Sequence, residues 1–181
     1  MDPVDLSLGD AAGYIITWRH ATGLQALRLL SEDTGMPEGP YSREVDCHLF
    51  AVSLRNVLRA VDLAERVVVA YPEQAEKIRD ARSVFSAEVP HAKDLRDVLE
   101  HFDHYASGGG RLRKKDAPPF PVMRWTERDG STHRLWLGVP PRPPMQLDIR
   151  VARDAAHLLA SETLEALDQA DARMRRRALD D

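Results

Sequence analysis

The fold of this chain is decided by residues 42–70, which read SREVDCHLFAVSLRNVLRAVDLAERVVVA. Ser42 is a residue type favoured at the N-cap of a helix. Apolar side chains then recur along the segment as a stripe, namely Val45, Leu49, Val52, Val57, Val61, Leu63 and Val67. We therefore predict one long helix over residues 42–70 that buries this stripe.

Further helices are predicted on both sides of this segment. Over residues 10–31, the apolar positions Ile15, Trp18, Leu24, Leu27 and Leu30 fit a helix, although Gly13, Gly23 and the run at 14–18 leave a strand open at its start. The Gly and Pro residues at 34–41 predict a loop. Pro72 suits the first turn of a helix that continues to about residue 87, and a last helix is predicted over residues 148–178.

The character of the sequence changes after Gly110. Residues 120–126 and 132–138 alternate apolar and polar side chains around Asp129-Gly130, which is a turn signal. We predict a β-hairpin insertion over residues 118–146 that includes a stiff proline-rich linker at 140–144. The expected architecture is thus mainly α, a single domain over residues 1–181 with four to five helices and this inserted hairpin.

Composition restricts the setting. The chain has 181 residues, 43% apolar and 30% charged, which is typical of one globular domain. Its formal net charge of -4 predicts no overall attraction to nucleic acid or anionic lipid. The single Cys47 excludes an intrachain disulfide framework and fits a reducing compartment. Without a basic signal region or a long apolar run, we expect a cytoplasmic protein with no membrane partner.

The strongest indication of chemistry is residues 93–105, KDLRDVLEHFDHY, in a helix that Pro90 is expected to open. Its predicted core side consists of Leu95, Val98, Leu99, Phe102 and Ala106. Asp97, His101 and Tyr105 are spaced i, i+4, i+8 and share another face. His titrates near neutrality and Arg keeps its charge, so the segment can move protons and bind a phosphate without a metal.

Spacing alone does not select this segment, because four Arg residues precede a His by five to seven positions. The pairs are Arg43 and His48, Arg96 and His101, Arg128 and His133, and Arg150 and His157. Arg128 and His133 flank the predicted hairpin turn, where they form an exposed strand pair. Of the four, only Arg96 is followed by Asp within an uninterrupted helix and has further titratable groups one turn after its His.

The residues Arg96-Asp97-Val98-Leu99-Glu100-His101 resemble the motif of the HEPN superfamily (higher eukaryotes and prokaryotes nucleotide-binding). Its members are small helical bundles with an Arg, usually followed by Asn, Asp or His, and a His a few residues later. The resemblance covers the long helices, and its specific part is these six residues. It implies a metal-independent endoribonuclease, often part of a toxin–antitoxin or antiphage system, working as a homodimer whose two motifs face one groove.

The resemblance also implies roles for the matching residues. Arg96 would hold the scissile phosphate, His101 would act as general acid or base on the ribose 2′-hydroxyl or the leaving oxygen, and Asp97 would orient them. Glu100, His104 and Tyr105 would support the site. In the branch of the family that is modified by a nucleotidyltransferase, a Tyr lies two residues after the His. Here Asp103 holds that position, which argues against this modification.

Several alternatives stay open. The basic residues Arg111, Arg113, Lys114 and Lys115 either contact RNA or form a solvated linker after a helix end. His91, His101 and His104 lack a further ligand at a recognised spacing, so we expect no metal and no cofactor. Trp18, Trp125 and Trp136 are expected to pack in the core or the hairpin, and the hairpin pair could instead form a partner-binding face.

Two further alternatives concern the motif itself. Arg55-Asn56 has the appearance of a broken copy, with Ala60 where a His is needed, and we interpret it as structural. The main alternative to a ribonuclease is a catalytically silent helical bundle that acts as a protein interaction or dimerisation module.

Overall fold

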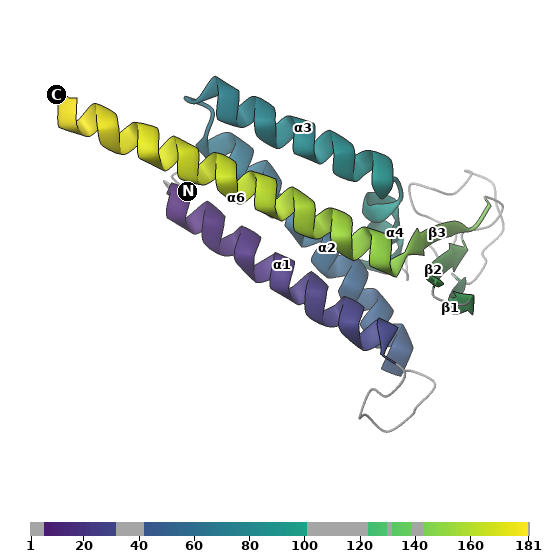
Figure 1. Cartoon of the computed structure of the whole chain (residues 1–181). Coiled ribbons are helices and arrows are strands. Elements are labelled where there is room, and N and C mark those ends of the chain that lie inside the picture. The colour runs from purple at the N-terminus through teal and green to yellow at the C-terminus, as the bar shows by residue number, and fades with distance from the viewer. Residues whose placement is uncertain (1–5, 32–41, 101–122, 130–131, 139–142, 181) are drawn as a thin grey trace.

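The computed structural model describes residues 6–31, 42–100, 123–129, 132–138 and 143–180. Within these ranges the chain forms five helices and one three-stranded sheet (Figure 1). The helices are α1 (Leu8–Leu30), α2 (Ser42–Val67), α3 (Pro72–Glu88), α4 (Ala92–Glu100) and α6 (Ile149–Asp180). The strands are β1 (Met123–Asp129), β2 (Thr132–Gly138) and β3 (Met145–Asp148). The protein is thus mainly α with a small antiparallel sheet, as the sequence predicted.

The four long helices pack side by side. α1 contacts α2 and α6, and α3 contacts α6 and α2. The short α4 packs against α2, near the end of the bundle where the sheet lies (Figure 1). At the opposite end, the last turns of α6 extend beyond α3 (Figure 1). One continuous apolar core runs through the helices and reaches β2 and β3 through Leu135, Leu137 and Leu147.

α1 is helical from Leu8 onward, so the strand that the sequence left open at its start does not form. Its N-terminus is a capping box. The Asp10 N–H donates to Ser7 Oγ at 3.1 Å, and the Ser7 N–H donates to Asp10 Oδ2 at 3.0 Å. The hydrogen bonds from Ser7 lower the pKa of the Asp10 carboxyl. These contacts fix the start of the helix despite the glycines that follow.

Packing does not require a glycine at position 13. It is exposed in the interior of α1, and a Cβ added there would meet no atom within 4 Å. Replacing Gly13 by Ala is therefore expected to raise the free energy of unfolding by about 0.5–1 kcal/mol, because Ala loses less backbone entropy in a helix. Chemical denaturation of both proteins measures the difference. Equal or lower stability of the variant would contradict this interpretation.

The buried face of α2 differs from the predicted stripe. Val57 and Val61 are buried as predicted, but Val45 and Leu49 are exposed and Val52, Leu63 and Val67 are only partly buried. The apolar positions of α2 that face the core are Cys47, Phe50, Ala51, Leu54, Val57, Leu58, Ala60, Val61 and Ala64. Successive residues turn by about 100° around a helix. The predicted apolar stripe therefore combined residues from two faces of α2. Only the face that includes Val57 and Val61 packs against the core.

α1 shows the same kind of difference. Leu24 and Leu27 belong to the apolar positions from which this helix was predicted, but both are exposed. The buried positions of α1 are Ala11, Ile15, Thr22, Ala26 and Leu29. Ala11, Thr22 and Ala26 are small and allow α1 to lie close to its neighbours. Leu24 and Leu27 are among the large apolar side chains that α1 presents to solvent.

The sheet has one strand more than predicted. β1 and β2 pair from Met123–Gly138 to Asp129–Thr132, which leaves residues 130–131 between them. Arg128 lies directly opposite His133, so the prediction that they form a strand pair is confirmed. β3 pairs with β2, although the sequence placed only a linker before the last helix. Asp148 then caps α6, because its Oδ1 accepts hydrogen bonds from the N–H groups of Arg150 and Val151.

Two predicted segments lie outside the described residues. These are the loop at 34–41 and the first part of the proline-rich linker, up to residue 142. The prediction for Pro72 is confirmed, since it occupies the first turn of α3.

Candidate functional site

The motif helix α4 is anchored by its apolar side. It begins at Ala92, two residues after Pro90, which lies in the preceding turn. The first turn closes through the Leu95 N–H, which donates to the His91 carbonyl at 2.8 Å. Leu95 and Val98 are fully buried, as the sequence predicted, and α4 contacts α2. Burial of these two side chains fixes the rotation of α4 about its axis.

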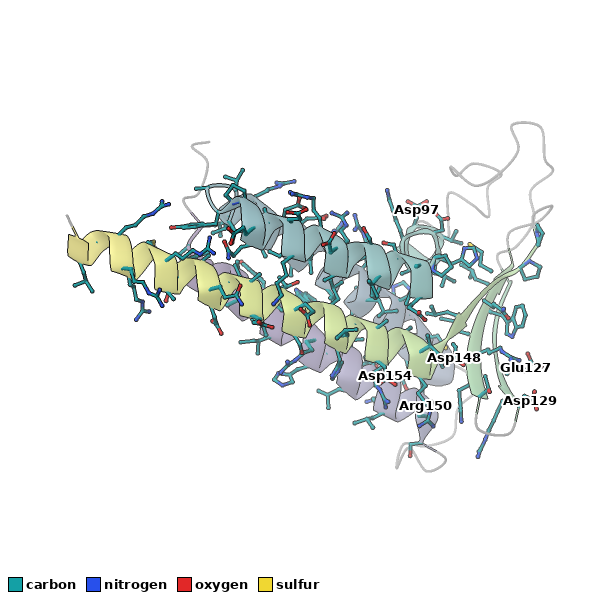
Figure 2. All side chains as sticks on the ribbon, turned by 45° about the horizontal axis from the view of Figure 1, so that its top comes forward. Asp97, Glu127, Asp129, Asp148, Arg150 and Asp154 are labelled. Carbon is teal, nitrogen blue, oxygen red and sulfur yellow. The ribbon has the colours of Figure 1, made fainter. Side chains whose placement is uncertain are left out.

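This rotation leaves Asp97 at the surface of α4. The side chain is partly exposed and lies on the outer side of the bundle, at a distance from the labelled residues of β1 and α6 (Figure 2). Asp94, in the first turn, is also partly exposed and complements the helix dipole there. Arg96 and Glu100 belong to the same helix. The helix therefore carries three charged residues of the motif, Arg96, Asp97 and Glu100.

The remaining residues of the predicted site lie outside the described part of the chain. These are His101, His104 and Tyr105, and the basic residues Arg111, Arg113, Lys114 and Lys115. Phe102 and Ala106, which were predicted on the core side of the motif helix, lie there as well. Of the predicted catalytic residues, only Arg96 and Asp97 belong to a described element.

A cluster of arginines on α2 and α3 was not predicted from the sequence. Arg55 is partly buried, and the nearby Arg59 and Arg82 are further cations. Burial lowers the pKa of Arg55, and repulsion from the two neighbouring guanidinium groups adds to this effect. Arg82 pairs with Asp62 at 2.5 Å, and Arg59 donates to Asn56 Oδ1 at 3.4 Å. Ala60 is buried, in agreement with a structural interpretation of Arg55-Asn56.

A second polar group lies between α1 and α6. His157 of α6 has a buried Nε2 without a hydrogen-bond partner in the described part of the chain. A Cβ at Gly23 of α1 would lie only 3.1 Å from this nitrogen. Burial lowers the pKa of His157, and the cations Arg19 and Arg153 lower it further. Asp154 acts in the opposite direction, and His20 adds a small lowering effect. The imidazole is thus held neutral.

This burial predicts that the protein loses stability in mild acid. Below about pH 6.5 the unfolded state gains a proton on His157 that the folded state resists, so the free energy of unfolding falls as the pH decreases. Replacing His157 by Gln is expected to remove part of this dependence. Urea denaturation of both proteins at several pH values between 5 and 7 measures it. An unchanged slope in the variant would show that His157 is not responsible.

A surface depression of described residues lies between α3 and α6. It has a volume of about 550 Å³ and is lined by Glu73, Glu76, Lys77, Asp80, Ala81, Val84, Phe85, Glu88, Ala155, Leu158, Leu159 and Glu162. Apolar side chains form its floor and carboxylates form its rim. No predicted site residue belongs to it. The sequence contains little indication of this depression, because the apolar residues of α3 and α6 each resemble ordinary core positions.

The sheet presents one face to the helices. Leu135 and Leu137 of β2 are buried, whereas Trp136 points to the other side and is partly exposed. The Trp136 indole N–H donates to Glu127 Oε2 at 2.8 Å. In the strand register Trp136 lies opposite Trp125. Trp18 of α1 is partly buried against the core.

In the ranges that the structure describes, no three His, Cys, Asp or Glu residues are arranged to hold a metal ion. Among the helices of these same ranges, none is both long enough and apolar enough to cross a membrane.

No family model, curated protein or solved structure matches this chain.

Proposed function

We propose that this protein is a metal-independent endoribonuclease of HEPN type whose site includes Arg96, Asp97 and His101. The observation that carries the proposal is the rotation of α4. With Leu95 and Val98 fully buried, Asp97 faces outward. α4 extends to Glu100, the residue directly before His101. A partly exposed carboxylate on a helix, four residues before His101 in the sequence, supports the proposal, because this chemistry needs a proton-transfer group and a group that orients it.

The proposed reaction is a transfer of the phosphodiester within the RNA chain. His101 takes the proton of a ribose 2′-hydroxyl, and the 2′-oxygen forms a bond to the adjacent phosphorus. The bond from phosphorus to the 5′-oxygen of the next nucleotide breaks, and this oxygen gains a proton from an acid in the site. Arg96 would hold the phosphate and stabilise its developing charge. The products would be a 2′,3′-cyclic phosphate and a free 5′-hydroxyl.

The proposal includes a homodimer in which two motifs share one groove. It is supported by four exposed apolar side chains, Leu24 and Leu27 of α1 and Val45 and Leu49 of α2. They belong to the last turns of α1 and the first turns of α2. In Figure 1 these turns lie at the end of the bundle that also carries α4 and the sheet. An antitoxin partner or an antiphage role is the biological context that this activity suggests.

The test is cleavage of a mixed RNA pool in excess EDTA by purified wild type, Arg96→Ala and His101→Ala. Each substitution is expected to lower the rate by at least about 100-fold, the size typical of a lost general acid, base or oxyanion contact. Arg66→Ala on α2 and His20→Ala on α1 are matched controls, because both residues are exposed and neither belongs to the motif. Absence of cleavage by wild type, or equal cleavage by all five proteins, would refute the proposal.

The second candidate is a protein interaction module without catalytic activity. The observation that favours it is the groove between α3 and α6, which combines an apolar floor with an acidic rim. A surface of this kind is common where another protein binds. The two functions can also coexist, since the groove contains no residue of α4.

A further inference from the structure

The groove between α3 and α6 has an apolar floor that is open to solvent. Val84 of α3 is 52% exposed and Leu158 of α6 is 53% exposed. Beside them the groove is lined by Ala81, Phe85 and Leu159. The depression has a volume of about 550 Å³ and contains large apolar side chains that are exposed to water. Covering this apolar surface would be favourable, because burial removes it from water. The floor can therefore accept apolar side chains from another molecule.

The rim of this groove is strongly acidic. Five carboxylates line it, and the single cation among the lining residues is Lys77. That cation is already engaged, since Lys77 Nζ lies 2.8 Å from Glu165 and 3.5 Å from Glu162. These carboxylates raise the pKa of Lys77. The rim thus has an excess of negative charge that its own lysine does not neutralise.

Three of the rim carboxylates have no ionic partner among the described residues. Glu76, Asp80 and Glu88 of α3 make no ion pair with any described residue, whereas Glu73 pairs with Arg173 from the projecting part of α6. The ion pair between Glu73 and Arg173 is an example, within this chain, of a rim carboxylate that binds an arginine from a helix. The three unpaired carboxylates leave equivalent positions open along the rest of the groove.

We propose that this groove binds an amphipathic helix of a partner protein, whose apolar stripe lies on Val84 and Leu158 and whose flanking Arg or Lys residues pair with Glu76, Asp80 and Glu88. From Glu73 to Glu88 the groove follows α3 for about 22 Å, which matches about 15 residues of helix. Apolar anchors at i, i+3, i+4 and i+7 are the usual pattern for a helix in such a groove. This binding function goes beyond RNA cleavage and does not depend on it.

The probe is a designed, fluorescently labelled helical peptide of about 15 residues with Leu at the anchor positions and Arg on both sides of the stripe. Fluorescence anisotropy measures its binding to the full-length protein at low and high salt. We expect saturable binding that weakens at least about tenfold at high salt, because exposed ion pairs are screened. A peptide with Glu in place of Arg, and one of the same composition with a scrambled stripe, are expected not to bind.

Two sets of variants assign the binding to the groove. The double variant Val84→Asn/Leu158→Asn removes apolar contact, and the triple variant Glu76→Gln/Asp80→Asn/Glu88→Gln removes charge. Each is expected to weaken binding at least about tenfold, that is, by 1.4 kcal/mol or more. Tyr14→Asn/Ile16→Asn and Asp129→Asn/Asp168→Asn are matched controls on exposed residues elsewhere, and they are expected to bind as wild type does. All substituted side chains are at the surface, so folding should be retained.

Three outcomes would overturn the proposal. One is that the basic peptide does not bind, and another is that the groove variants bind it as tightly as the controls do. The third is that wild type self-associates in sedimentation and Val84→Asn/Leu158→Asn makes it monomeric. In that case a second copy of the chain covers the groove. The RNA-cleavage assay does not enter any of these outcomes, so the two proposals fail or stand separately.

Discussion

Replacing Phe50 by Ala is expected to lower the free energy of unfolding by about 4 kcal/mol, the middle of the range for a buried Phe. Phe50 is fully buried on the core-facing side of α2, in the first half of this helix. Its removal loses apolar burial and leaves a cavity that close-packed neighbours fill only in part. Urea denaturation followed by circular dichroism at constant pH measures this loss.

The neighbouring Leu49 is the matched control. It is 43% exposed, although the apolar pattern of the sequence suggested the opposite orientation for α2. Replacing Leu49 by Ala is expected to cost less than about 1 kcal/mol, because an exposed side chain loses little burial. If Leu49→Ala destabilised the protein as much as Phe50→Ala does, the rotation of α2 described here would be wrong.

The second large effect is expected at the ion pair between α1 and α2. Arg28 Nε lies 2.9 Å from Asp46 Oδ1. The two atoms form an ion pair but not a hydrogen bond, since Asp46 Oδ1 accepts no hydrogen bond from the described residues. The Asp46 side chain is only 3% exposed, whereas that of Arg28 is 44% exposed. Replacing Arg28 by Met keeps the aliphatic stem but leaves a buried charge uncompensated. We expect a loss of about 3 kcal/mol, the lower end for a broken buried pair, since water reaches Arg28.

A double-mutant cycle distinguishes this cause from a loss of packing. Once Asp46 is replaced by Ala, the further substitution Arg28→Met should have little effect, because no buried charge remains. The double variant is therefore expected to be more stable than Arg28→Met alone. Additive losses in the cycle would mean that the two side chains contribute independently, contrary to the contact in the structure.

The helices could be predicted well from the sequence, whereas their buried faces could not. Pro72 and Asp148, where two helices were predicted to begin, lie within one residue of the observed starts of α3 and α6, because such residues act locally. The buried faces of α1 and α2 depend on tertiary packing. Many of the positions that face the core are small, including Ala11, Ala26, Ala51 and Ala64. An apolar pattern based on large side chains overlooks such positions.

The third strand shows a similar limit. Residues 145–148 read MQLD, which is too short and too weakly alternating to predict a strand against the neighbouring prolines. The strand forms because β2 offers an unpaired edge beside it, and because Leu147 is buried in the same core as Leu135 and Leu137. Both causes are non-local.

For the candidate site, the sequence predicted the helix and its inner face. The sequence placed Leu95 and Val98 on the core side of the motif helix and Asp97 on another face. In α4, Leu95 and Val98 are fully buried and Asp97 is partly exposed. The acidic rim of the groove between α3 and α6 was not predictable, because its carboxylates come from two helices separated by about half of the chain. Its two halves meet only once α3 packs on α6.

The measurement that tests the central claim most directly is the chemistry of the cleaved end. A short labelled RNA and the same RNA with a single 2′-deoxy substitution at the cut site are incubated with the wild-type protein in excess EDTA, and mass spectrometry identifies the products. We expect a 2′,3′-cyclic phosphate from the RNA and no cut at the 2′-deoxy position, because the proposed nucleophile is the 2′-oxygen and the proposed reaction needs no metal. Cleavage at the 2′-deoxy position, or an RNA that stays intact in EDTA, would contradict it.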